Sequence, residues 1–193
     1  MSARLGSLLL ILASALALYG MQRSTPRYMD LTGPIVERGV MGEAVDTRLF
    51  QATVERVQFA RQLAYRRLGA EQVRDTGGVW AIVWLRLAAA DTSATMAEAA
   101  WLGPDGLAYR HTDRLSLARG VPPYALDPGL PRSVRLVFEI RPDQARGAAL
   151  LLSSRYGPRL DSQARIALDD VPVDADGRPQ AIARYDLDQE SPP

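Results

Sequence analysis

Val79-Trp-Ala-Ile-Val-Trp-Leu-Arg-Leu87 determines the architecture expected of this 193-residue chain. Eight of its nine residues are apolar, and in an extended chain they fall on both faces. The stretch is rich in β-branched and aromatic side chains, which strands favour. A run of this kind predicts a strand at the centre of a sheet, covered on both sides.

More strands are predicted on its C-terminal side. Ser133–Ile140 alternates apolar and polar side chains, as a strand with one buried face does. Two short strands are predicted at 147–153 and 163–168. With about six short strands joined by turns, we expect an all-β sandwich.

A hairpin is predicted around Gly103-Pro104-Asp105-Gly106. Proline presets φ for the second position of the turn, and glycine accepts the left-handed position. The apolar residues at 99–102 and 107–109 would form its two strands.

Residues 48–68 fit two structures. Their apolar side chains recur at the spacing of a helical stripe. They also alternate as in a strand, from Phe50 to Val54 and from Val57 to Phe59, with a change of phase at Arg56 that a β-bulge would produce. A helix here would make the domain α+β instead of all-β.

Leu5 to Met21 carries no charge over 17 residues and follows a positive leader with Arg4. This length is the short limit for a membrane-spanning helix, and it also suits a signal peptide. We expect an uncleaved, single-pass anchor, with a cleaved signal as the alternative; a buried helix of the domain is the least favoured reading. Everything that follows is too polar to span. We therefore expect the N-terminus in the cytoplasm and the domain outside the cell inner membrane.

Four segments are expected. Residues 1–21 form the membrane anchor or signal, and 22–46 a stalk containing Pro26, Pro34 and several glycines. Residues 47–170 form the β-sandwich, and 171–193 an acidic, largely flexible tail in which Ala181–Leu187 could add an edge strand. The last 25 residues carry a net charge of −5, against +6 for the rest.

Composition excludes several kinds of chemistry. The chain has no cysteine, which rules out disulfides, thiolate metal sites and a cysteine nucleophile. Its single histidine rules out a multi-histidine metal cage within one chain. The net charge of +1 gives no reason to expect a nucleic-acid partner. All 23 basic residues are arginine, which codon bias in a GC-rich genome would produce.

Catalytic and metal-binding candidates are weak. His111 stands near Asp113 and Ser116, but residues so close in sequence rarely form a triad, and no nucleophile-elbow motif is present. The acids at 169–176 do not match the register of a calcium loop, although they precede Gly177. We therefore expect no catalytic, cofactor-binding or metal-binding residues, and no cofactor.

Two further groups have a structural and a functional interpretation. Trp80, Trp84 and Trp101 could line a ligand pocket, but in a sandwich we expect them in the core. A basic stretch could contact anionic lipid or an acidic partner, although a solvated face is the more common role of such charges. It comprises Arg56, Arg61, Arg66, Arg67 and Arg74, opposed by Glu55 and Glu71.

The order of turn and core residues resembles a known family. The matching residues are Leu102-Gly103, Asp105-Gly106, Tyr109, Pro128-Gly129 and Val137-Phe138-Glu139-Ile140 followed by a proline. Over residues 48–169 the chain resembles the telokin-like, immunoprotective-antigen group of bacterial extracytoplasmic domains, many of unknown function. It departs from the pattern where Arg141 separates Ile140 from Pro142, and it lacks a lipidated cysteine. The resemblance implies an immunoglobulin-like β-sandwich and no active site.

Together these features predict a non-enzymatic, membrane-tethered module, held by Leu5 to Met21, that binds a protein partner as accessory to an envelope or transport complex. The alternative is a secreted module that binds a small ligand or a metal. An envelope hydrolase around His111 is the least supported hypothesis.

Overall fold

The computed structural model describes residues 2–24, 32–115 and 122–188. The chain divides into two compact units, residues 1–33 and 34–193. In the first unit, helix α1 (Ser2–Ser24) contains a window from Gly6 to Ser24 with a mean hydropathy of 1.3, none of it buried. By length and composition, this helix can cross a membrane.

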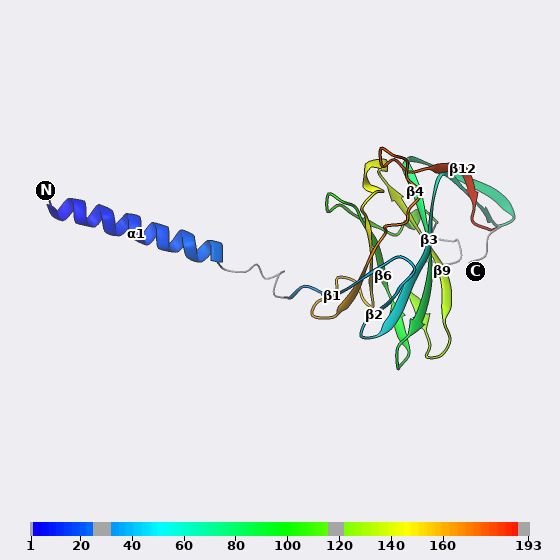
Figure 1. Ribbon diagram of the computed structural model, residues 1–193, viewed down its shortest axis with the longest axis horizontal. Helices are drawn as coiled ribbons and strands as arrows, with labels where there is room; N and C mark the ends of the chain where they lie inside the picture. The colour runs from blue at the N-terminus through cyan, green and yellow to red at the C-terminus, as the bar shows by residue number, and fades with distance from the viewer. Residues whose placement is uncertain (1, 25–31, 116–121, 189–193) are drawn as a thin grey trace. The chain divides into compact units, whose positions relative to one another are not determined.

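The second unit is a β-sandwich (Figure 1). Its strands are β1 (Ile35–Val40), β2 (Ala44–Asp46), β3 (Phe50–Arg67), β4 (Ala70–Ala89), β5 (Ala94–Met96), β6 (Glu98–Leu102), β7 (Ala108–Arg110), β8 (Tyr124–Leu126), β9 (Arg132–Ile140), β10 (Ala149–Ser153), β11 (Ser162–Ala167) and β12 (Ala181–Asp186). Two short 3₁₀ helices, η1 (Asp113–Leu115) and η2 (Pro142–Gln144), lie between strands.

The strands form two main sheets. The first has the order β1-β11-β10-β6-β7, and the second the order β12-β3-β4-β9 with β2 added to β3. Strands β5 and β8 form a separate pair. Apolar side chains from both main sheets meet in one buried cluster, which includes Phe59, Val83 and Phe138 from the second sheet and Trp101 and Leu150 from the first. The sandwich follows from this shared core.

The predicted central strand is confirmed. Residues 79–87 lie within β4, between β3 and β9, and Val79 to Leu85 are all buried. Val79, Ala81, Val83, Leu85 and Leu87 face the shared core. The opposite face carries Trp80, Ile82 and Trp84, which belong to a second apolar cluster on the outer side of the sheet.

Residues 48–68 form a strand and not a helix. Strand β3 spans 18 residues and pairs with β4. The register shifts between Val54 and Arg56, where the sequence predicted a bulge. Placing the extra residue at Glu55 keeps Val54 and Val57 both buried, which an unbroken alternation would not allow.

The other predicted strands are also present. Strands β9, β10 and β11 occupy the three ranges expected for them. The turn at 103–106 joins β6 to β7, with Gly106 at φ +80° and its backbone N–H bonded to the Gly103 carbonyl at 3.0 Å.

The segment from Ile35 to Asp46, assigned to a stalk from sequence, instead contributes two strands to the sandwich. Strand β1 pairs in parallel with β11, and β2 pairs with β3. The glycines that suggested a linker serve a tight turn. Gly42 has φ +81°, and a Cβ on Gly39 would lie 2.2 Å from Val45 Cγ2.

The C-terminal segment is likewise more ordered than the predicted flexible tail. Strand β12 pairs in parallel with β3, as the edge strand considered for Ala181–Leu187 would. Before it, Val171 and Val173 pack against the core. Strand pairing and apolar contacts therefore hold this segment against the domain, although it is acidic. Residues 189–193 lie outside the described residues.

Candidate functional site

His111 lies where the two main sheets approach each other. Its backbone N–H bonds to the Ala99 carbonyl of β6 at 3.3 Å, and the next N–H, of Thr112, bonds to the Val137 carbonyl of β9 at 3.1 Å. The imidazole contacts the Phe138 ring edge-on. Ser116 and the Asp113 side chain lie outside the described part of the chain. The described geometry gives His111 a structural role.

The acids near the C-terminus do not gather around a common point. Among the described residues, no group of three or more potential ligands is arranged to hold a metal ion. Asp174 has a local role, because its carboxylate accepts a hydrogen bond from the Arg178 N–H at 2.8 Å and closes the turn that contains Gly177.

All three tryptophans lie in the core, with at most 1% of their surface exposed. Trp101 Nε1 donates to the Gln144 carbonyl at 2.9 Å. Trp80 Nε1 donates to the Arg74 carbonyl at 3.2 Å. The structural interpretation of these residues is therefore confirmed, and they are not available to a ligand.

The basic stretch separates into two environments. Arg56 stacks on the Trp84 ring, with its guanidinium carbon 3.9 Å from the ring centroid. The two opposing acids pair with other arginines: Glu55 with Arg86 and Glu71 with Arg184. Arg66 and Arg67 are exposed at the end of β3.

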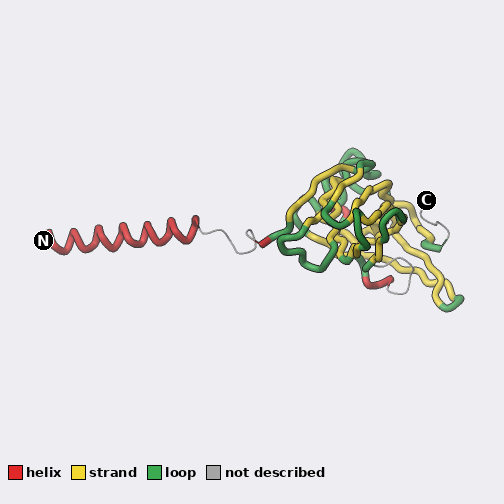
Figure 2. The backbone as a smooth tube through the Cα atoms, turned by 90° about the horizontal axis from the view of Figure 1, so that it is seen from below, coloured by secondary structure: helices red, strands yellow, loops and turns green. Residues whose placement is uncertain are grey.

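Beyond a second register shift at Ala60/Gln62, β3 and β4 continue as a hairpin arm, residues 62–75 (Figure 1; Figure 2). Leu63 and Tyr65 of the arm are buried in the second apolar cluster, together with Tyr185 of β12. This packing fixes the base of the arm against the outer face of the sheet.

The arm ends in a two-residue turn at Leu68 and Gly69, between Arg67 and Ala70. Both have positive φ, +51° and +82°, as a type I′ turn requires. Asparagine, aspartate or glycine usually occupies the first of these positions, and a leucine there costs about 1–2 kcal/mol. Leu68 is also 99% exposed. We call residues 66–69 the hairpin tip.

Sequence reasoning identified Arg66 and Arg67 as candidates but missed Leu68. The available signal was a glycine between two alternating runs, preceded by an apolar residue where a turn former is usual. That signal was hidden while residues 48–68 could still be read as a helix.

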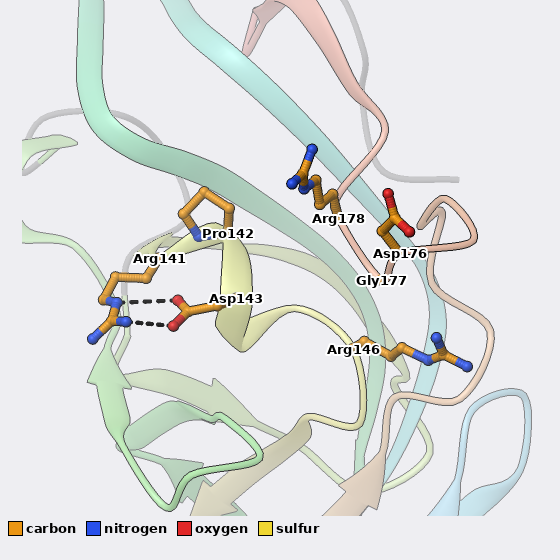
Figure 3. A pocket seen from close by; sticks show the side chains of 7 residues that line it. All are labelled: Arg141, Pro142, Asp143, Arg146, Asp176, Gly177 and Arg178. Atoms are coloured by element: carbon orange, nitrogen blue, oxygen red, sulfur yellow. Dashed lines mark hydrogen bonds and ion pairs between the residues drawn. The ribbon is translucent and has the colours of Figure 1, made fainter.

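A depression of about 640 Å³ lies beside η2 (Figure 3). It is lined by Arg141, Pro142, Asp143, Arg146, Asp176, Gly177 and Arg178. Arg141 Nε pairs with Asp143 Oδ1 at 3.0 Å, and Arg146 Nη1 reaches the Ala175 carbonyl at 3.5 Å. Three arginines face two aspartates here, so the excess charge suits a small anion.

Asp161 is a buried carboxylate that holds loops together. Arg48 donates to its Oδ1 at 2.8 Å, Ser154 Oγ to its Oδ2 at 3.1 Å, and the Ser162 N–H to Oδ1 at 2.9 Å. Burial by itself would raise the pKa of Asp161, but these hydrogen bonds outweigh burial and lower it. Its partners come from separate segments of the chain, so we assign it a structural role.

Comparisons with known proteins show the fold. No protein-family model matches the sequence, and no curated protein matches it. The solved yjhA protein of Bacillus subtilis is similar, with a TM-score of 0.51 and 14% identity over 68% of this chain and 99% of that one. An uncharacterised β-sandwich protein of Clostridium difficile has a TM-score of 0.44 and 13% identity over 73% and 99% of the two chains. At these identities the first likeness shows a shared β-sandwich fold and nothing about activity.

Proposed function

We propose that this chain is a membrane-tethered, extracytoplasmic β-sandwich module that binds a protein partner as an accessory to an envelope or transport complex. The observation that carries the proposal is a helix able to span a bilayer, α1, joined to a β-sandwich domain. We place the helix in the cell inner membrane as a single span through Leu5 to Met21, with the domain on the extracytoplasmic side. The immunoglobulin-like topology and the resemblance to the telokin-like group belong to this proposal.

A non-enzymatic role fits the positions of the titratable groups. His111 contributes backbone hydrogen bonds between the sheets, and the buried carboxylate of Asp161 is bonded to Arg48. The hydroxyl next to Asp161, that of Ser154, donates to the carboxylate and so belongs to the same hydrogen-bond network that joins the loops. Binding is therefore the function that the surface of the domain supports best.

The test uses the full chain with a C-terminal tag. Cells are treated with a short amine-independent photoactivatable crosslinker, and the tagged chain is purified under denaturing conditions. We expect one envelope protein to be recovered in near-stoichiometric amount, and the His111→Ala variant to recover it equally well. Recovery of no partner would contradict the proposal. So would a hydrolytic activity that purifies with the chain and disappears in His111→Ala.

The arginine-lined depression favours a second candidate, a module that binds a small anion. Arg178 has no ion pair within the described residues, and its neighbour Arg146 bonds only a carbonyl there. Inorganic phosphate and succinate serve as probes in a thermal-shift measurement on the full chain. A saturable stabilisation that Arg178→Ala abolishes would support this candidate, and an unchanged melting temperature would exclude it for these anions.

A further inference from the structure

The hairpin tip combines a left-handed backbone, an exposed apolar side chain and two adjacent arginines, none of which the fold itself needs. Leu68 holds a left-handed backbone conformation with its side chain 99% exposed, so it makes no packing contribution in return for the strain. Asparagine would serve the turn better. Strain retained at an exposed position indicates a role outside the stability of the domain.

Charge gathers beside this leucine. Arg66 and Arg67 directly precede it, and neither forms an ion pair with any residue that the structure describes. The acid across the hairpin, Glu71, is already paired with Arg184 of β12. The Asp188 carboxylate accepts a hydrogen bond from the Arg66 backbone N–H, which leaves the guanidinium of Arg66 available.

The arm below the tip is held in place. Strand β12 pairs with β3 up to Ala64, and the Leu187 N–H bonds to the Ala64 carbonyl at 2.8 Å. Tyr65 is 4% exposed. The tip therefore projects from an ordered base, and a partner would not need to order the arm on binding.

The tip lies far from the point where the chain enters the domain. The Ile35 N–H bonds to the Asp161 carbonyl, and Asp161 also binds Arg48, just before β3 begins at Phe50. The tip is at the other end of this strand, after roughly 55 Å of strand path. A partner docked at the tip would therefore leave the chain-entry end of the domain uncovered.

We propose that the hairpin tip is the docking element for an acidic protein surface. Leu68 enters an apolar recess in the partner, and the guanidinium groups of Arg66 and Arg67 pair with carboxylates at its rim. A rigid apolar anchor flanked by arginines has the composition of a binding hot spot. This inference rests on the partner-binding function proposed above and specifies the surface that performs it.

The test places a photoreactive residue at the tip. Leu68 is replaced by p-benzoylphenylalanine in the full chain, which is irradiated in living cells. The matched control is the same replacement at Leu160, which is also exposed, has φ +49° and follows an arginine, but lies beside Asp161 at the end where the chain enters. We expect a discrete protein adduct from position 68 and at least about tenfold less from position 160. Reversing the charge of both tip arginines in Arg66→Glu/Arg67→Glu should reduce the adduct from position 68 by about tenfold. Arg159→Glu should leave that adduct unchanged.

Each outcome decides the proposal. Mapping the adduct to a segment of the partner rich in aspartate and glutamate supports it. An adduct with lipid, equal adducts at both positions, or an adduct insensitive to Arg66→Glu/Arg67→Glu would overturn it. If the whole-surface crosslinking described above recovers a partner and position 68 does not, the docking element is wrong and the proposed function stands. If neither recovers a partner, both fail.

Discussion

Asp161 shows how one residue can join distant parts of this domain. Its carboxylate is 5% exposed and binds Arg48, 113 positions earlier in the chain, as well as Ser154 in the preceding loop. Its backbone carbonyl accepts the Ile35 N–H at the start of β1. The residue therefore fixes the point at which the first strand joins the sandwich.

The lowered pKa of Asp161 predicts a pH-dependent contribution to stability. A carboxyl whose folded pKa lies below its unfolded value, near 4, stabilises the fold above that value and loses this effect as the pH falls through the folded pKa. Asp161→Asn should therefore lower the free energy of unfolding by about 2 kcal/mol at pH 7, and by less at pH 3. Urea unfolding of the full chain in detergent at the two pH values measures this.

The control for that experiment is Asp143→Asn. The Asp143 carboxylate is 49% exposed and pairs with Arg141 on the surface, so its loss should change stability by less than about 0.5 kcal/mol. The assignment would be contradicted if the difference in free energy of unfolding between wild type and Asp161→Asn were as large at pH 3 as at pH 7.

Leu68 leads to the opposite expectation. Leu68→Asn relieves the left-handed backbone strain and removes no packing, so it should stabilise the domain by about 1 kcal/mol and raise its melting temperature by roughly 2–4 °C. Circular dichroism of the full chain during heating provides the measurement. Leu130→Asn, also exposed but without a positive φ, should leave the melting temperature unchanged. A lower melting temperature for Leu68→Asn would show that the turn does not store strain.

At the scale of elements, the bend in β4 creates the hairpin arm. Between the pairs Ala60–Trp80 and Gln62–Asp75, β3 has one unpaired residue, Arg61. Strand β4 has four there, residues 76–79. The excess residues are held by Thr76, whose hydroxyl donates to Glu139 Oε1 at 2.7 Å and accepts the Gly78 N–H at 2.9 Å. The bend lets Trp80 meet the Arg74 carbonyl and thus forms the second apolar cluster.

Two neighbouring glycines test this bend. A Cβ on Gly78 would lie 2.2 Å from the Ile140 carbonyl oxygen, whereas a Cβ on Gly77 would meet nothing within 4 Å. We expect Gly78→Ala to lower the free energy of unfolding by about 2 kcal/mol because β9 must shift, and Gly77→Ala to change it by less than about 0.5 kcal/mol. Urea midpoints of the two variants provide the comparison. Similar values would contradict the close approach of β4 and β9.

The elements that could be predicted from sequence are those with local causes. The phase slip at Arg56 and the Gly103–Gly106 turn depend on side-chain alternation and φ preference, which neighbouring residues reveal. Strand β1 could not be found in this way, because its stability comes from pairing with β11, more than a hundred residues later. The sequence alone could not show why residue 39 is a glycine. Its missing Cβ makes room for the Val45 side chain, which the turn brings alongside, and without the turn Gly39 suggested only a linker.

The candidate site, too, could be predicted only where its features depend on neighbouring residues. Arg66 and Arg67 could be predicted as a basic group from their order alone. The pairing of Glu71 with Arg184, which leaves these arginines without that acid, depends on β12, more than a hundred residues away in sequence. The hairpin arm and its tip therefore could not be predicted without knowing where the C-terminal segment lies in the fold.

At the scale of the whole molecule, the proposed function assigns the two units to different solvents. Helix α1 exposes an apolar surface that water does not favour, whereas the sandwich buries its apolar side chains in its own core. A bilayer would accommodate this surface, and a helix satisfies its own backbone hydrogen bonds there. Tethering would also raise the effective concentration of the hairpin tip near partners in the same envelope.

The most direct test of this account is the fate of the full chain in a cell. The chain, tagged at its C-terminus, is expressed in a bacterium, the envelope is extracted with alkaline carbonate, and spheroplasts are exposed to protease. A membrane-tethered module predicts a full-length chain that stays in the carbonate pellet and a domain that is digested from outside. A shortened, soluble form, or a domain protected until the cells are lysed, would contradict it.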